Sequence, residues 1–123
     1  MRTKPNLVKN ILTILLVFLL IATVTASAKS IPQPVKIPPV ASFTCSPKVV
    51  HVGGNVHFTD TSTPGFGHGK IVGRAWYINN RMVSQAHSFI YSFDVAGRYS
   101  VKLKIGTADD TTASTIGYVT VKE

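Results

Sequence analysis

One stretch constrains the fold of this chain more than any other part of the sequence. It covers residues 93–105 and reads FDVAGRYSVKLKI. Its first residues read as a turn, in which Gly97 can take a positive φ that other residues resist. After the turn, apolar and polar residues alternate, and the apolar ones are Tyr99, Val101, Leu103 and Ile105. This period of two predicts a strand with one face buried and one face in water. The rest of the chain must therefore supply strands that cover the apolar face.

The N-terminal residues predict export of the chain. Arg2, Lys4 and Lys9 form a basic start without any acid, and residues 11–28 carry no charge and end in Ala-Ser-Ala. These are the features of a secretory signal peptide. The alternative is an uncleaved membrane anchor, because the apolar run approaches the roughly 20 residues that a helix needs to cross a bilayer. Either segment places the remainder outside the cytoplasm, secreted or anchored to the outer face of the cytoplasmic membrane.

A proline-rich segment follows, with the sequence KSIPQPVKIPP at residues 29–39. Proline removes backbone donors and favours extended geometry, so this segment is interpreted as a spacer. The predicted organisation is a signal peptide or anchor at 1–28, a linker at 29–39 and a folded domain at 40–123.

From residue 40 onward the chain reads as short strands separated by turn residues, without a helical period of adequate length. Asn79-Asn80 is one predicted tight turn, because asparagine tolerates left-handed φ. The strand candidates are residues 41–45, 55–59, 71–78, 81–84, 88–93, 99–105 and 111–121. This spacing predicts an all-β, seven-stranded immunoglobulin-like β-sandwich, preceded by the N-terminal hydrophobic signal or anchor helix.

The domain resembles the PKD family, the immunoglobulin-like module named for polycystic kidney disease protein. The motifs that carry the resemblance are ASF at residues 41–43, VHFTDTS at 56–62, Trp76, the stretch 93–103, and Val119 with Val121. The family's D-F-G-D-G after the tryptophan is replaced by YINNR at 77–81, so nothing that rests on that acidic turn is carried over. The resemblance implies an extracellular adhesion or spacer module rather than an enzyme.

No catalytic, cofactor-binding or metal-binding constellation is predicted. The acidic residues lie in separate loops or at the chain end and are interpreted as solvated turn residues; they are Asp60, Asp94, Asp109, Asp110 and Glu123. The histidines lack metal-ligand spacing, and no serine stands in a nucleophile motif. The single cysteine, Cys45, excludes an internal disulfide, and its parity with Ala41 and Phe43 predicts a small buried side chain. The alternative is pairing between molecules, as an odd cysteine in a secreted chain can do.

Two aromatic residues are assigned to structure rather than to ligand binding. Trp76 shares parity with Ile78 and is predicted to fill the core, as tryptophans on the third strand of sandwich domains do. Tyr99 follows the turn at Gly97 and resembles a tyrosine corner, whose hydroxyl bonds to an upstream backbone group.

Other residues are candidate ligand contacts. Phe66 lies in a glycine-rich loop, and Tyr77 and Tyr118 have the opposite parity to their inward neighbours. Lys102, Lys104 and Lys122 share the outward parity of two adjacent strands and predict one three-lysine patch. In a chain of net charge +8, such a patch predicts weak, salt-sensitive contact with anionic polymers or lipid headgroups. Nucleic acid is not an expected partner of an exported chain without interleaved aromatics.

Two functions remain open from the sequence. The first is a non-enzymatic, exported cell-surface module for protein–protein interaction, adhesion or spacing. The alternative is a carbohydrate-binding module that uses exposed aromatic side chains. The predicted partner is accordingly a protein or a glycan at the cell surface, and a membrane only through the N-terminal segment.

Overall fold

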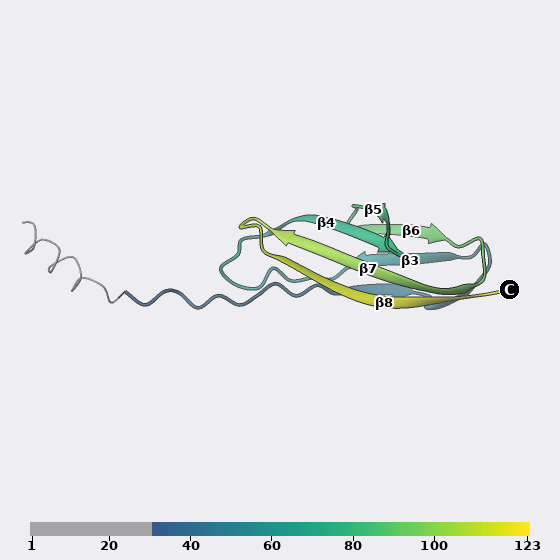
Figure 1. Cartoon of the computed structure of the whole chain (residues 1–123), viewed down its shortest axis with the longest axis horizontal. Helices are drawn as coiled ribbons and strands as arrows, with labels where there is room; N and C mark the ends of the chain where they lie inside the picture. Colours follow the sequence, from purple (N-terminus) through teal and green to yellow (C-terminus); the bar gives the residue numbers. More distant parts are fainter. Residues whose placement is uncertain (1–30) are drawn as a thin grey trace, which may run out of the picture. The chain divides into compact units, whose positions relative to one another are not determined.

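The computed structural model describes residues 31–123, which are all β-structure and connecting loops (Figure 1). The predicted signal or anchor helix lies outside these residues. A compact unit covers Pro34–Glu123. Its strands are β1 (Phe43–Ser46), β2 (Val49–His51), β3 (Asn55–Asp60), β4 (Ile71–Ile78), β5 (Arg81–Ser84), β6 (Ser88–Ser92), β7 (Gly97–Thr107) and β8 (Thr112–Lys122).

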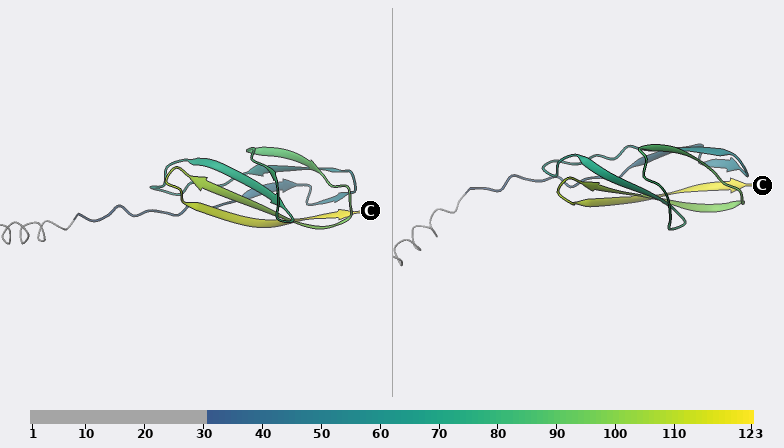
Figure 2. Two further views of the ribbon diagram at one scale, coloured as in Figure 1. Left: turned by 45° about the horizontal axis from the view of Figure 1, so that its top comes forward. Right: turned by 90° about the horizontal axis from the view of Figure 1, so that it is seen from above.

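The strands form two sheets packed face to face (Figure 2). One sheet has three strands in the order β1-β3-β6, and the other has five in the order β2-β8-β7-β4-β5. The alternation of residues 99–105 dictates this arrangement, since it leaves β7 with an apolar face that only a second sheet can cover. The all-β sandwich predicted from the sequence is confirmed for the described residues.

The predicted strand count was one too low. Strand β2 has only three residues, and it pairs in parallel with the end of β8, from Val49 opposite Thr120 to His51 opposite Lys122. A segment this short shows no period that a sequence pattern can reveal. Strand β1 belongs to the three-stranded sheet and β2 to the five-stranded sheet, so the chain passes from one sheet to the other in the short connection that contains Pro47.

Two predicted turn features are confirmed. Asn79 and Asn80 have φ values of 47° and 65°, and they connect β4 to β5. Such paired positive φ values suit the twist of a two-residue hairpin. The Tyr99 hydroxyl donates a hydrogen bond to the carbonyl oxygen of Val95 at 2.6 Å, which ties the start of β7 to the turn before it.

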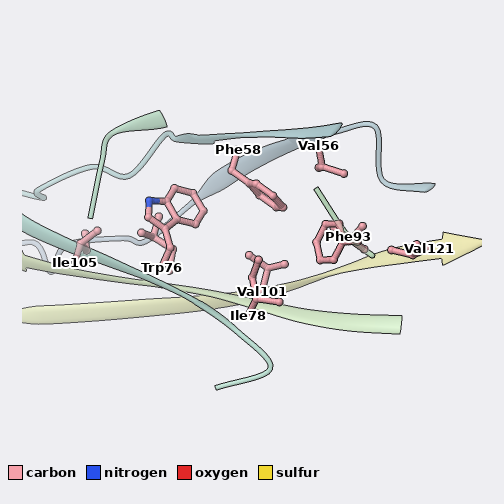
Figure 3. Close-up of a cluster of buried hydrophobic side chains, with 10 residues drawn as sticks. Val56, Phe58, Trp76, Ile78, Phe93, Val101, Ile105 and Val121 are labelled. Atoms are coloured by element: carbon pink, nitrogen blue, oxygen red, sulfur yellow. The ribbon is translucent and has the colours of Figure 1, made fainter. Parts of the chain in front are cut away.

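Apolar side chains from both sheets fill the space between them (Figure 3). Trp76 is fully buried, as predicted, and its ring packs against Phe43, Phe58 and Phe89 at centroid distances of 5.3, 5.9 and 5.1 Å. Its indole nitrogen donates to the carbonyl oxygen of Ala86 at 2.9 Å, so the one polar atom of this ring is satisfied. Cys45 is half-buried against this core.

The interpretation of Asp60 as a solvated turn residue was wrong. Asp60 ends β3 in the three-stranded sheet, is only 5% exposed, and accepts a hydrogen bond from Nε of Arg74 on β4 at 2.8 Å. It also accepts one from the backbone N–H of Ser62 at 2.8 Å. Burial alone would raise the pKa of Asp60, but the hydrogen bonds from Ser62 and Arg74 outweigh it and lower the pKa. This ion pair therefore joins the two sheets.

The end of the proline-rich segment contacts the loop between β3 and β4. Ile37 exchanges backbone hydrogen bonds with Phe66, and Val40 does so with Thr63. In the turn between β7 and β8, Asp109 is hydrogen-bonded by Thr111, Thr107 and His68, and these bonds hold the pKa of its carboxyl well below the usual range. The Lys36 ammonium lies 3.3 Å from the same carboxylate. Asp109 is thus part of a polar cluster and not an isolated turn residue.

Candidate interaction surface

The described residues, 31–123, hold no cluster of three or more histidine, cysteine or acidic side chains that could bind a metal ion. They also contain no helix with the length and hydrophobicity that a bilayer crossing requires. The feature that stands out is a sheet surface on which several candidate residues meet.

This surface is the side of the five-stranded sheet that faces away from the core. Its side chains alternate along each strand with the buried residues Trp76, Val101 and Leu103. We call it the outer face and define it by seven residues, which are Tyr77 of β4, Met82 of β5, Arg98, Lys102 and Lys104 of β7, and Ile116 and Tyr118 of β8.

Strand register sets the neighbours on the outer face. Tyr77 is opposite both Met82 and Lys102, and Lys102 is opposite Ile116 in turn. One row across four strands therefore reads methionine, tyrosine, lysine, isoleucine. Because adjacent strands lie about 4.8 Å apart, these side chains are in mutual reach.

Cationic side chains lie over the tyrosine rings of this face. The Arg98 guanidinium carbon is 4.1 Å from the centre of the Tyr118 ring, and the Lys102 ammonium is 5.9 Å from the centre of the Tyr77 ring. A ring face attracts a cation electrostatically, and a guanidinium stacked flat keeps its N–H edge free for a carboxylate. The tyrosines therefore act here as platforms that orient positive charge.

Apolar surface is interspersed with these charges. Met82, Ile116 and Tyr118 are 53%, 58% and 51% exposed. Single exposed apolar residues need no explanation, but three on one face beside oriented cations are typical of an interaction surface.

The outer face carries positive charge without a compensating acid. All five acidic residues of the chain lie within the described part, and none is on this face. Asp60 is buried on the other sheet, Asp94 precedes β7, Asp109 and Asp110 lie in the β7–β8 turn, and Glu123 follows β8. The local field is therefore positive, and it favours an acidic partner.

The structure brings together four of the six predicted contact residues, Tyr77, Tyr118, Lys102 and Lys104. Tyr77 is half-buried rather than fully exposed. Phe66 is 61% exposed but lies in the loop before β4.

The predicted three-lysine patch is wrong in its extent. Lys122 has the outward parity, but Lys102 pairs with Ile116, so Lys122 lies six positions further along β8, about 20 Å from Lys102. Its neighbour on this side of the sheet is Arg98, which is opposite Thr120, two positions before Lys122.

Sequence reasoning missed Arg98, Ile116 and Met82 as members of this face. The predicted strand began at Tyr99, whereas β7 begins at Gly97 and Arg98 has the same parity as Lys102. Extending the alternation by one residue toward the turn would have found it. Met82 and Ile116 lie on the outer face because they are opposite Tyr77 and Lys102, and the sequence does not show this register between strands.

No protein-family model and no curated protein matches the sequence. Similar solved structures include the PKD1 domain of Vibrio cholerae metalloprotease PrtV, with 26% identity, a TM-score of 0.60, and coverage of 71% of this chain and 100% of that domain. The PKD1 domain of Vibrio anguillarum Epp is similar too, with 26% identity, a TM-score of 0.59, and coverage of 72% and 98%.

A solved structure of carbohydrate-binding modules from the β-sandwich superfamily also shares the fold, with 24% identity and a TM-score of 0.64. The match covers 73% of this chain and 36% of that one. Together these neighbours identify the fold as one used by extracellular-type β-sandwich modules. Residues 34–123 thus form a PKD-like domain of the immunoglobulin fold, as the sequence motifs predicted.

Proposed function

We propose that this chain is an exported, non-enzymatic surface module that binds an acidic protein surface through the outer face. The observation that supports this most is the pair of cations held over Tyr77 and Tyr118, on a face without any acidic residue. Interfaces of this kind combine aromatic and arginine anchors with apolar contacts, and Met82 and Ile116 supply the latter.

Arg98 is the residue we expect to contribute most specificity. Its guanidinium lies over the Tyr118 ring, with the guanidinium carbon 4.1 Å from the ring centre, so we expect the side chain to lose little freedom when a carboxylate binds it. Lys102 and Lys104 act as flexible point charges beside it and mainly raise the association rate.

Carbohydrate binding is the second candidate, supported by the fold shared with carbohydrate-binding modules and by the exposed ring of Phe66. Sugar stacking needs a free ring face. Arg98 occupies one face of the Tyr118 ring, and for this reason the outer face suits carboxylates better than neutral sugars.

The test is binding of an acidic probe, polyglutamate, to the full chain at low and at physiological salt. The outer-face variant Arg98→Gln/Lys102→Gln/Lys104→Gln is compared with a control that loses the same charge elsewhere, Lys36→Gln/Lys70→Gln/Arg81→Gln. We expect at least a tenfold weakening for the outer-face variant only, and weaker binding of the parent at higher salt.

Three outcomes would redirect the proposal. Equal weakening in both variants would mean that net charge alone attracts the probe. Binding of anionic vesicles in preference to polyglutamate would indicate lipid headgroups as the partner. Binding of a neutral glycan that is lost on Phe66→Ala, but not in the outer-face variant, would favour the carbohydrate function.

Export rests on the N-terminal residues, and the proline-rich segment would hold the domain away from its point of attachment. Mass spectrometry of the extracellular protein checks this. A mature N-terminus at Lys29 supports cleavage after Ala28, and an intact N-terminus in the membrane fraction supports an anchor. A chain retained in the cytoplasm would contradict both.

A further inference from the structure

Strand β6 differs from the other edges of the two sheets. The remaining edges are β1, β2 and β5. Strand β5 carries a charge at Arg81, β2 has only three residues, and β1 borders a groove of about 390 Å³ whose other wall is β8. Strand β6 pairs only with β3, runs along the margin of the sandwich and has the uncharged sequence SFIYS (Figure 2). Natural edge strands usually carry charges or proline that prevent pairing, and β6 has neither.

The register shows which backbone groups of β6 are free. The Asp60 N–H donates to the His87 carbonyl oxygen at 2.9 Å, and these two residues continue the β3–β6 register. In an antiparallel pair, hydrogen-bonded positions alternate along each strand. Phe89 and Tyr91 therefore direct their backbone groups toward β3, whereas Ser88, Ile90 and Ser92 direct theirs away from it, toward the open edge.

The sequence of β6 is nearly symmetric about Ile90, with serine at both ends and an aromatic residue on either side. We propose that β6 pairs antiparallel with β6 of a second copy of this chain, with the two Ile90 residues opposite each other at a twofold axis. Ser88 then lies opposite Ser92 of the other copy. The free N–H and C=O groups of all three outward positions find partners, and the two three-stranded sheets become one continuous sheet.

Side chains on both faces of β6 fit this arrangement. Ile90 is 57% exposed and would be covered by its counterpart. Phe89 and Tyr91 are half-buried at the core margin, and each would lie opposite the other across the axis, an aromatic pair of the kind that stabilises sheets. No charge is brought close to a like charge, because Ser88–Ser92 contains none.

Disulfide trapping in the full chain tests the pairing and its register. In a Cys45→Ser background, Ile90→Cys should form a disulfide-linked dimer, because directly opposed residues have Cα atoms about 5.5 Å apart, within the range that a disulfide spans. The control is Ile116→Cys, which is 58% exposed on another surface. Ser88→Cys and Ser92→Cys should each crosslink poorly alone and efficiently when the two variants are mixed.

A second measurement avoids the added thiol. Ile90→Lys places like charges next to each other at the axis and should abolish the dimer seen by sedimentation, whereas Ile116→Lys should leave it intact. Both positions are exposed, so both variants should fold. A parent chain that stays monomeric at tens of micromolar, or trapping by Ile90→Cys no stronger than by Ile116→Cys, would overturn the proposal.

Discussion

Replacing Arg74 by methionine tests the ion pair that joins the two sheets. Methionine keeps most of the aliphatic contact but removes the charge, and leaves the Asp60 carboxylate, whose side chain is 2% exposed, without its cationic partner. Breaking a buried pair in this way typically costs about 3–5 kcal/mol. Because the Arg74 side chain is 24% exposed and water can partly replace it, we expect about 3 kcal/mol at pH 7.

The loss should depend on pH in a defined direction. In the parent the pKa of Asp60 is lowered, so the pair stabilises the fold above the unfolded value of about 3.9 and is lost as the pH falls through the folded value. In Arg74→Met, burial acts with less opposition, so the pKa of Asp60 is higher than in the parent and this variant loses less stability as the carboxylate is protonated. The difference in unfolding free energy between parent and variant should therefore shrink toward acidic pH.

Urea unfolding at pH 7 and pH 3 measures this difference, with the fluorescence of Trp76 as the probe, since it is the one tryptophan in the chain. The double variant Asp60→Asn/Arg74→Met is the control, and should be more stable than Arg74→Met at pH 7 because it buries no charge. A destabilisation of equal size at both pH values, or a double variant no more stable than the single one, would refute the reasoning.

Three further variants have defined expectations. Trp76→Ala should lower the unfolding free energy by about 3–5 kcal/mol, seen as a lower melting temperature by circular dichroism, and an unchanged melting temperature would contradict the core assignment. Tyr99→Phe removes the hydrogen bond from the Tyr99 hydroxyl to Val95 and should lower the unfolding free energy by about 1 kcal/mol, measured by urea unfolding. An unchanged unfolding free energy would mean that this bond is absent in solution. Asp109→Asn should flatten the fall in stability below pH 4, because the lowered pKa of this carboxyl links folding to its ionised form, and an unaltered acid profile would speak against the cluster.

The sequence predicted those features of the fold that depend on neighbouring residues. Alternation in residues 93–105 is a local signal, and the strand lies there as β7. The paired asparagines 79 and 80 could be assigned to a turn because their own side chains tolerate the required φ. Trp76 could be assigned to the core from its parity with Ile78.

Features that depend on contacts between distant segments could not be predicted. Strand β2 exists because of its pairing with β8, some 70 positions later in the chain. The burial of Asp60 depends on Arg74 from the other sheet. For the candidate surface, parity showed which lysines point outward, but only the register showed that Lys122 is far from Lys102.

From the parallel pairing of β2 with β8 we expect the domain to resist mechanical load. A tension applied between the start and the end of the domain would pull β2 and β8 in opposite directions along their shared axis. The bonds between them, including Thr120 N–H to Lys48 O at 2.9 Å and Val52 N–H to Lys122 O at 2.8 Å, would then be sheared together instead of opened one after another. A module attached through its N-terminal side and pulled from its C-terminal side would withstand more force than the small size of β2 suggests.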